Sequence, residues 1–193
     1  FKISIGDFYK TRKDREKLSK NIHPLLITRG VPGTHDTDLI LDFFRKVKSK
    51  KFSSISLPKF DKSIDDRVKK KNWYKIKKKP DIVILEGWCV GSSSQKLKNL
   101  KKPINFLEKN MDHKLKWRKY VNNQLNSRYK TIHKMFSCFL YLKAKNFSLL
   151  RRWRFKQEKK LYLRNKNKKN SKIMSKNEVL NFMMTYQRIT EHM

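Results

Sequence analysis

The 193-residue chain is long enough to bury the core of one ordinary domain. Its formal net charge of +34 would usually indicate nucleic acid as a partner, but lysines are spread through nearly every segment and form no arginine-rich stripe with interleaved aromatic residues. Two cysteines, Cys89 and Cys138, are too few to indicate a disulfide framework or a zinc site, and no apolar stretch is long enough to span a membrane. We therefore expect a cytoplasmic protein whose primary function is not nucleic-acid binding.

The first third of the chain predicts a strand, a loop and a helix. Residues 1–5 alternate in polarity and stop at Gly6-Asp7, which is typical of a strand that feeds a loop. Residues 8–22 have a helical or mixed character, and residues 25–36 carry two glycines and a proline, which favours a structured loop. A helix should follow, capped by Thr34 or Asp36, because its apolar residues recur at helical spacing. These are Leu39, Ile40, Phe43, Phe44 and Val47.

The middle of the chain is predicted to contain the central strand. Residues 53–57 are a candidate short strand, and residues 58–79 are polar and lysine-rich, which predicts a mobile loop anchored by Trp73. Residues 81–85 form an apolar run rich in β-branched residues between Pro80 and Gly87. This pattern is typical of a central strand that is buried on both faces, as in a parallel sheet covered by helices.

The last part of the chain predicts helices separated by one more strand. Residues 114–135 should form a long helix, residues 136–142 a buried strand and residues 147–163 another helix. Residues 164–172 are a low-complexity linker or loop. A last helix should span residues 175–189, with Ser175 and Glu178 in a capping box. Strands that alternate with helices predict an α/β domain.

Glu86 is placed where the central strand should end. Ligands in open α/β sheets collect at the carboxyl ends of strands, so an acid there has a natural role beside a metal ion or a phosphate. The alternative is a solvated loop glutamate, which position alone would favour.

The stretch from Arg29 to Asp36 places a guanidinium, an imidazole and a carboxylate around two glycines at a helix start. Arg29 can grip a carboxylate or phosphate through two parallel hydrogen bonds, and backbone N–H groups at the helix start add to an anion site. In the alternative, Asp36 only caps the helix and His35 is a surface residue.

Two further charged stretches are open to more than one interpretation. The run from Lys59 to Arg67 packs alternating charges into a short loop, which is usually a solvated feature. Arg151 and Arg154 lie on the opening turns of a predicted helix. Arginines on a movable lid can neutralise charge on a phosphoryl group in transfer, but a merely basic helix face has the same appearance.

Seven segments taken in order resemble D-glycerate 3-kinase-like proteins, P-loop kinases related to uridine kinase, phosphoribulokinase and pantothenate kinase. The resemblance covers nearly the whole chain from Ser4 to Thr190, and any one of these motifs alone would be weak. The segments are SIGDFYKT, RGVPGTHD, LPKFDKS with a following DR, PDIVILEGWCVG, KWRKYVNNQL, WRFKQE and MSKNEVLNFMMTYQRIT.

The resemblance implies a P-loop-type three-layer α/β fold with a mainly parallel sheet, and residues 1–193 as one kinase-like domain with a lid-like helix and basic loop at residues 147–172. It also implies ATP- and Mg²⁺-dependent transfer of a phosphoryl group to a hydroxyl of a small anionic acceptor, possibly glycerate. Catalysis in such enzymes is mostly positioning and charge neutralisation. Glu86 would hold Mg²⁺ or its water, and Arg151 and Arg154 would act from the lid. The implied acceptor-pocket residues are Arg29, His35, Asp36, Lys59, Asp61 and Arg67.

The sequence departs from the family pattern at two places. None of its five glycines is followed by lysine, so the G-x-x-x-x-G-K-[ST] loop that cradles phosphates is absent, and we expect a truncated or divergent amino terminus. Gly6 stands where the family has the first of two adjacent aspartates, and related kinases use that residue as the base. Asp7 is then the remaining candidate for the base or for a ligand of a metal-bound water.

Two other functions compete with the kinase. The first is a non-catalytic relative that keeps the fold and binds an anionic ligand or a protein. The second is a basic protein that binds nucleic acid on a kinase-like scaffold. An upstream strand with a G-x-x-x-x-G-K-[ST] loop would favour a truncated enzyme, whereas duplex binding that survives physiological salt would favour the nucleic-acid function.

Overall fold

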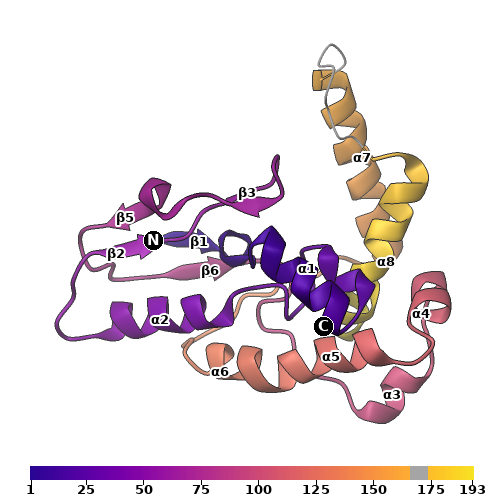
Figure 1. Ribbon diagram of the computed structural model, residues 1–193, viewed down its shortest axis with the longest axis horizontal. Coiled ribbons are helices and arrows are strands. Elements are labelled where there is room, and N and C mark those ends of the chain that lie inside the picture. The colour runs from indigo at the N-terminus through magenta and orange to yellow at the C-terminus, as the bar shows by residue number, and fades with distance from the viewer. Residues whose placement is uncertain (166–173) are drawn as a thin grey trace. The chain divides into compact units, whose positions relative to one another are not determined.

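The computed structural model describes residues 1–165 and 174–193 (Figure 1). It divides into two compact units: Phe1–Lys101 with Lys114–Phe139, and Lys102–His113 with Leu140–Met193. Of the helices in the described part of the chain, none is both long enough and apolar enough to cross a membrane. Residues 166–172, which belong to the predicted linker and lid-like segment, lie outside the described residues.

The first unit contains a parallel pair of strands, β1 (Lys2–Ser4) and β6 (Ile84–Glu86). Their register places Ser4 opposite Glu86, so both strands end at the same edge. The 3₁₀ turn η1 (Ile5–Phe8) follows β1 directly and carries Asp7 to that edge. The predictions that a strand precedes Gly6-Asp7 and that Glu86 ends a strand are therefore confirmed.

The prediction that β6 is buried on both faces is wrong. Ile82 and Ile84 are 70% and 57% exposed. The reason is that β1 is the only sheet neighbour of β6 among the described strands, so one edge and part of one face of this apolar segment stay uncovered.

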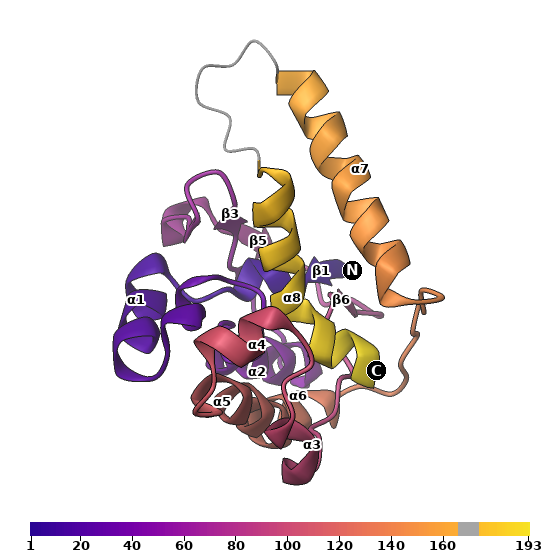
Figure 2. The same cartoon turned by 90° about the vertical axis from the view of Figure 1, so that its right-hand side faces the viewer.

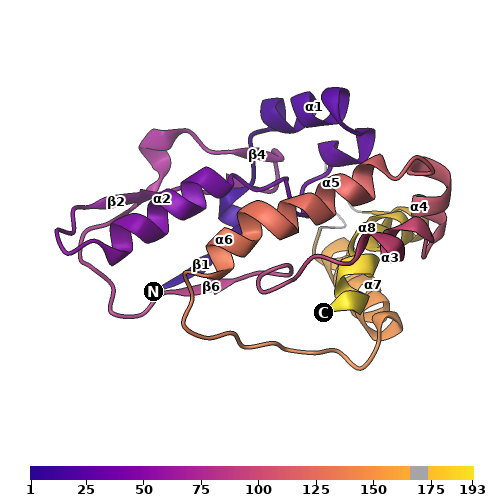
Figure 3. The same cartoon turned by 90° about the horizontal axis from the view of Figure 1, so that it is seen from below.

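Helices cover one face of the β1–β6 pair (Figures 1 and 3). Helix α2 (Thr37–Lys48) begins as predicted at Asp36, whose side chain accepts a hydrogen bond from the Leu39 N–H. Beside α2 runs a continuous helical stretch of three parts: α5 (Lys116–Gln124), the π-helical turn η4 (Leu125–Tyr129) and α6 (Lys130–His133). The buried face of this stretch contains Trp117, Val121, Leu125, Tyr129 and Ile132.

Residues 58–79 are not the featureless loop that we expect from their composition. Strand β3 (Phe60–Asp61) pairs with β4 (Asp66–Arg67), and β2 (Ile55–Leu57) pairs with β5 (Tyr74–Ile76), both antiparallel. The 3₁₀ turn η3 (Lys70–Asn72) precedes β5. Helix α1 (Arg12–Asn21) holds the β3–β4 hairpin, because the Arg12 N–H donates to Asp66 and the Arg12 and Arg15 guanidiniums bind Asp65. Helix α1 is followed by the 3₁₀ turn η2 (Pro24–Ile27).

The predicted buried strand at residues 136–142 is also wrong. The segment has no regular secondary structure, and Leu140 and Leu142 are 89% and 86% exposed. An apolar run becomes a strand only where a neighbouring strand supplies hydrogen-bond partners, and no described strand lies against this one. The rings of Phe136 and Phe139 pack edge to face instead, with centroids 5.7 Å apart.

The first unit also contains the short helix α3 (Leu97–Lys101). The second unit is helical, with α4 (Phe106–Met111), α7 (Phe147–Asn165) and α8 (Lys176–His192). Helices α7 and α8 lie side by side and bury Phe147, Val179 and Met183 (Figure 2). The predicted capping box at Ser175 and Glu178 is present.

Candidate functional site

Asp7 and Glu86 lie at the carboxyl ends of the paired strands β1 and β6, close enough for the charge of Glu86 to act on Asp7. Burial raises the pKa of Asp7 above its ordinary value, and the negative charge of Glu86 raises it further. A hydrogen bond from the Phe60 N–H and the charges of Lys62 and Lys59 act in the opposite direction. The raising effects are larger, so Asp7 is a stronger base than an ordinary aspartate, which suits a group that takes up a proton.

Phe60 connects this carboxylate to the predicted anion-binding arginine. Its backbone N–H donates to Asp7 Oδ1 at 3.4 Å, and the Arg29 guanidinium lies 5.6 Å from its ring centroid. Arg15 lies at a similar distance, 5.7 Å, from the same ring. One residue of β3 thus places Asp7 and Arg29 in the same part of the first unit.

Arg29 does not project alone toward solvent, because it forms an ion pair with Asp65. Arg12 Nη1 and Arg15 Nη1 lie 2.9 and 3.1 Å from Asp65 Oδ2, so three guanidiniums share one carboxylate. Burial opposes ionisation of Asp65, but hydrogen bonds and charge from Arg15 and Arg29 hold its pKa below the ordinary value. The cluster has more positive than negative charge, which is favourable for a small anion.

Arg67 and Asp36 are also paired. Arg67 Nη2 lies 3.2 Å from Asp36 Oδ2 and donates to the Tyr9 carbonyl at 2.6 Å. Asp36 caps α2 at the same time. The helix-cap alternative is therefore correct for Asp36, and its second oxygen ties the β3–β4 hairpin to the loop.

His35 is neither a surface residue nor a lining residue of an open pocket. It is 1% exposed, its Nδ1 lies 2.5 Å from the Tyr129 hydroxyl, and its ring stacks on Tyr9 with centroids 4.5 Å apart. Burial, with a smaller effect of the charge of Lys10, lowers the pKa of His35 to about 3. A neutral, enclosed imidazole cannot touch a ligand that approaches from solvent, so direct acceptor binding by His35 finds no support here.

Of the remaining predicted pocket residues, Lys59 lies near Asp7, whereas Asp61 interacts within its own hairpin. Lys59 is close enough to Asp7 for its charge to act on that carboxylate. Asp61 instead binds its own turn, since its Oδ1 accepts from the Ser63 N–H at 2.8 Å and from the Ser63 hydroxyl at 2.6 Å. Asp61 is therefore a turn residue of the hairpin.

Arg151 and Arg154 lie on α7 of the second unit. Arg151 Nη2 donates to Ser148 Oγ at 3.3 Å, and its guanidinium lies over the Phe147 ring. Arg154 forms an ion pair with Glu158 and lies 5.3 Å from the Phe182 ring centroid. Both arginines have local partners, and their action on a phosphoryl group stays a prediction.

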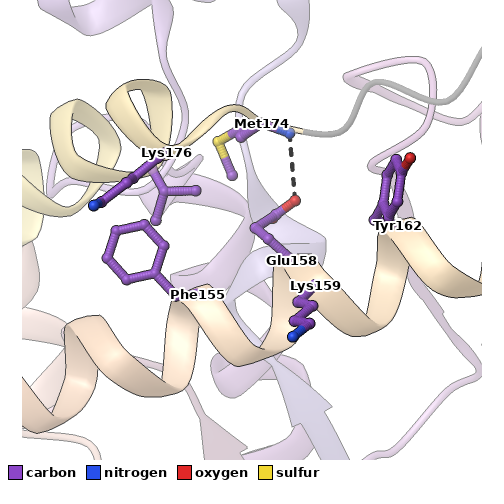
Figure 4. Close-up of a pocket in the computed structure, with 7 residues that line it drawn as sticks. Phe155, Glu158, Lys159, Tyr162, Met174 and Lys176 are labelled. Carbon is purple, nitrogen blue, oxygen red and sulfur yellow. Dashed lines mark hydrogen bonds between the residues drawn. The ribbon is translucent and has the colours of Figure 1, made fainter.

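A cavity of about 410 Å³ opens between α7 and α8 (Figure 4). Glu158 lies on its wall and accepts a hydrogen bond from the Met174 N–H at 3.4 Å. The other lining residues are Phe155, Lys159, Tyr162, Lys176 and Val179. No residue predicted to be catalytic or acceptor-binding lines this cavity.

The predicted magnesium ligand, Glu86, can be tested against the chemistry of its surroundings. Mg²⁺ prefers oxygen ligands, usually binds one or two carboxylates plus substrate phosphates, and keeps several of its waters. Asp7 and Glu86 supply two such carboxylates, so the residues fit the ion. The described ranges contain no group of three or more His, Cys, Asp or Glu residues that could hold a metal ion.

Sequence reasoning missed Phe60, Asp65, Tyr9 and Tyr129. In the sequence, Phe60 and Tyr9 have the pattern of ordinary apolar positions, and Asp65 lies within a charged run that is typical of a solvated loop. The one available signal was the repeated acid Asp65-Asp66 directly before Arg67, which can anchor a hairpin. Their roles depend on contacts between segments far apart in the sequence, such as the 50 residues that separate Arg15 from Asp65.

A search of protein-family models gives no match. The chain is similar to Uncharacterized kinase mug58 of Schizosaccharomyces pombe, with 31% identity over 96% of this chain and 66% of that protein. It is 40% identical to Probable ATP-dependent kinase TDA10 of Saccharomyces cerevisiae, over 46% of this chain and 33% of that protein.

A solved structure, D-glycerate 3-kinase from Cryptococcus neoformans, matches with a TM-score of 0.81 and 25% identity, over 99% of this chain and 68% of that chain. The chain therefore has the α/β fold of a P-loop kinase, as the sequence predicts. Its relatives are D-glycerate 3-kinase and related ATP-dependent kinases, which confirms the resemblance. The chain spans about two thirds of the length of mug58 and about one third of TDA10.

Proposed function

We propose that this protein is an ATP-dependent kinase that phosphorylates a hydroxyl of a small anionic acceptor, with D-glycerate as the first candidate. The observation that carries the proposal is the meeting of Asp7 and Glu86 at the ends of two parallel strands, with the Arg29 cluster joined to Asp7 through Phe60. The names of the relatives support the reaction type and ATP as the phosphoryl donor.

The residues divide the work according to their charge. Arg29 and Lys59 attract the acceptor anion and orient its hydroxyl toward Asp7. Asp7 takes the hydroxyl proton as the acceptor oxygen bonds to the γ-phosphorus and the bond from that phosphorus to the ADP oxygen breaks. Glu86 would hold Mg²⁺ through a carboxylate oxygen or a bound water. The ion, when bound, neutralises charge on the phosphate oxygens.

The test is phosphoryl transfer from γ-labelled ATP to D-glycerate by the full product of the gene. We expect labelled phosphoglycerate, and we expect Glu86→Gln to lower the rate by at least about a hundredfold while its circular dichroism and melting temperature stay unchanged. Glu86 is exposed at a strand end, so the amide does not disturb a core. Glu191→Gln, on an exposed part of α8, is the matched control and should keep the wild-type rate. Full turnover in Glu86→Gln would remove Glu86 from the mechanism.

A further inference from the structure

The loop that carries Arg29 and Asp36 rests on the π-helical turn η4 through one buried tyrosine. The Tyr129 hydroxyl accepts a hydrogen bond from the Gly33 N–H at 3.2 Å and lies 2.5 Å from His35 Nδ1. Tyr129 and His35 are 0% and 1% exposed. Their interaction is therefore shielded from water, where a hydrogen bond is strong and an unsatisfied partner is costly.

The hydrogen-bond partners indicate where the protons lie. His35 Nε2 has no partner among the described residues. If Tyr129 donates its proton to His35 Nδ1, only the Nε2–H group is left unpaired. If instead His35 Nδ1–H donates to Tyr129, then both the tyrosine proton and the Nε2 lone pair lack partners among the contacts that the structure gives. The first arrangement leaves fewer unsatisfied groups, so it is favoured.

The loop also lies directly against the helix below it. Gly33 has φ of +98°, and a Cβ at this position would lie 2.5 Å from the Tyr120 ring. Only glycine fits this close approach and this backbone conformation without strain. Tyr129 stands on a π-helical turn, an irregularity that is frequent at functional sites because it redirects side chains out of the regular helical pattern.

The same contacts extend to the segment that carries Asp7. The Asp36 N–H donates to the Phe8 carbonyl at 2.7 Å, and the Lys10 N–H donates to the Thr34 carbonyl at 2.9 Å. The Tyr9 ring stacks on His35. Fixing His35 and Gly33 therefore fixes both sides of the candidate site, the Arg29 loop and the Asp7 turn.

We propose that Tyr129 is a positioning residue for the acceptor site: its hydroxyl accepts from the Gly33 N–H, donates to His35 Nδ1, and so holds the Arg29–Asp36 loop in its binding position. The proposal rests on the proposed function in that the loop is taken to bind an acceptor anion. Tyr129 itself touches no acceptor, since it is fully buried.

The experiment compares the wild-type chain with Tyr129→Phe and with Tyr120→Phe. Tyr120 is a matched control because its ring lies against the same glycine, while its hydroxyl forms no hydrogen bond with the described residues. Three quantities are measured: the ¹⁵N shifts of the His35 ring, the hydrogen-exchange rate of the Gly33 amide, and the dissociation constant for D-glycerate by calorimetry. The first two require no ligand.

We expect His35 to carry its proton on Nε2 in the wild type and to lose this single tautomer in Tyr129→Phe. We expect the Gly33 amide to exchange at least about tenfold faster, and D-glycerate to bind at least about fivefold more weakly, in Tyr129→Phe only. A proton on Nδ1 in the wild type would overturn the inference, and so would unchanged Gly33 exchange or unchanged affinity in Tyr129→Phe. If the wild type binds no D-glycerate but the first two results hold, the fault lies in the proposed acceptor and not in the Tyr129 contact.

Discussion

Single residues in this protein have properties that their neighbours impose. His35 follows two glycines in a loop, which is typical of a surface histidine, yet it is enclosed by Tyr9 and Tyr129. Arg29 has the chemistry of an anion-binding residue, yet it is already paired with Asp65. Such pairings could not be derived from residue type, because each partner lies more than 25 positions away in the sequence.

The enclosure of His35 predicts a pH dependence of stability. Its pKa is about 3 in the folded chain and about 6.5 when unfolded, so the unfolded state binds more protons between these values. Stability is therefore fully present above pH 6.5 and falls as the pH drops toward 3, by up to about 1.4 kcal/mol per pH unit.

Urea unfolding at pH 7, 6 and 5 measures this effect. The fall in unfolding free energy should be smaller in His35→Gln, which cannot titrate, than in the wild type. His113→Gln changes an exposed histidine and should retain the wild-type slope. Equal slopes in all three proteins would show that His35 is not the group responsible.

At the scale of elements, the β3–β4 hairpin illustrates where sequence reasoning succeeded and where it failed. Helix α2, the long helical stretch and the capping box of α8 were predictable because their signals are local: apolar spacing and capping residues. The hairpin and the coil at residues 136–142 were not predictable from sequence, because their structures depend on whether distant segments supply side-chain or strand partners. Asp65 forms ion pairs with three arginines, and these hold the hairpin in place. The apolar run from Phe136 to Leu142 has no neighbouring strand among the described residues with which to pair.

We therefore predict that Asp65→Asn weakens the attachment of the β3–β4 hairpin to Arg12 and Arg15 of helix α1. Asparagine tolerates the left-handed backbone at this position, where φ is +56°, so the substitution removes charge without adding backbone strain. Arg15, which is fully buried, would lose its carboxylate, and we expect a loss of about 3 kcal/mol in unfolding free energy. Asp61→Asn, in the same hairpin but at an exposed turn, should cost less than about 1 kcal/mol. Similar losses in both variants would contradict the central role of Asp65.

The buried ion pair between Arg188 and Glu108 allows a corresponding prediction for the second, helical unit. Arg188 Nε and Nη2 lie 2.7 and 2.6 Å from the two carboxylate oxygens of Glu108, and both residues are buried. Glu108→Gln removes the charge that balances Arg188 and should destabilise the packing of α4 on α8 by about 3 kcal/mol. Glu191→Gln, on an exposed part of α8, should have an effect within about 0.5 kcal/mol. Thermal unfolding followed by circular dichroism compares the two, and an unaffected Glu108→Gln would show that Arg188 is balanced by other groups.

At the scale of the whole molecule, the high positive charge and the kinase-like fold point to different partners. The charge is spread along the sequence, while the candidate acids and the Arg29 cluster gather at one strand edge of the first unit. A diffuse positive field attracts any anion, but it does not select among anions. We therefore assign specificity to the local cluster and only general attraction to the net charge.

The central claim is that the Arg29 cluster binds a small anionic hydroxy acid, and calorimetric titration with D-glycerate tests it most directly. We predict that the wild-type chain binds D-glycerate, that uncharged glycerol does not bind, and that Arg29→Ala weakens D-glycerate binding by about tenfold, or about 1.4 kcal/mol. Asp65 keeps Arg12 and Arg15 as partners, so this variant should stay folded. Arg45→Ala, which removes an equal charge from the exposed side of α2, should bind as the wild type does. Equal affinity in Arg29→Ala and the wild type, or equal binding of glycerol and D-glycerate, would contradict the account.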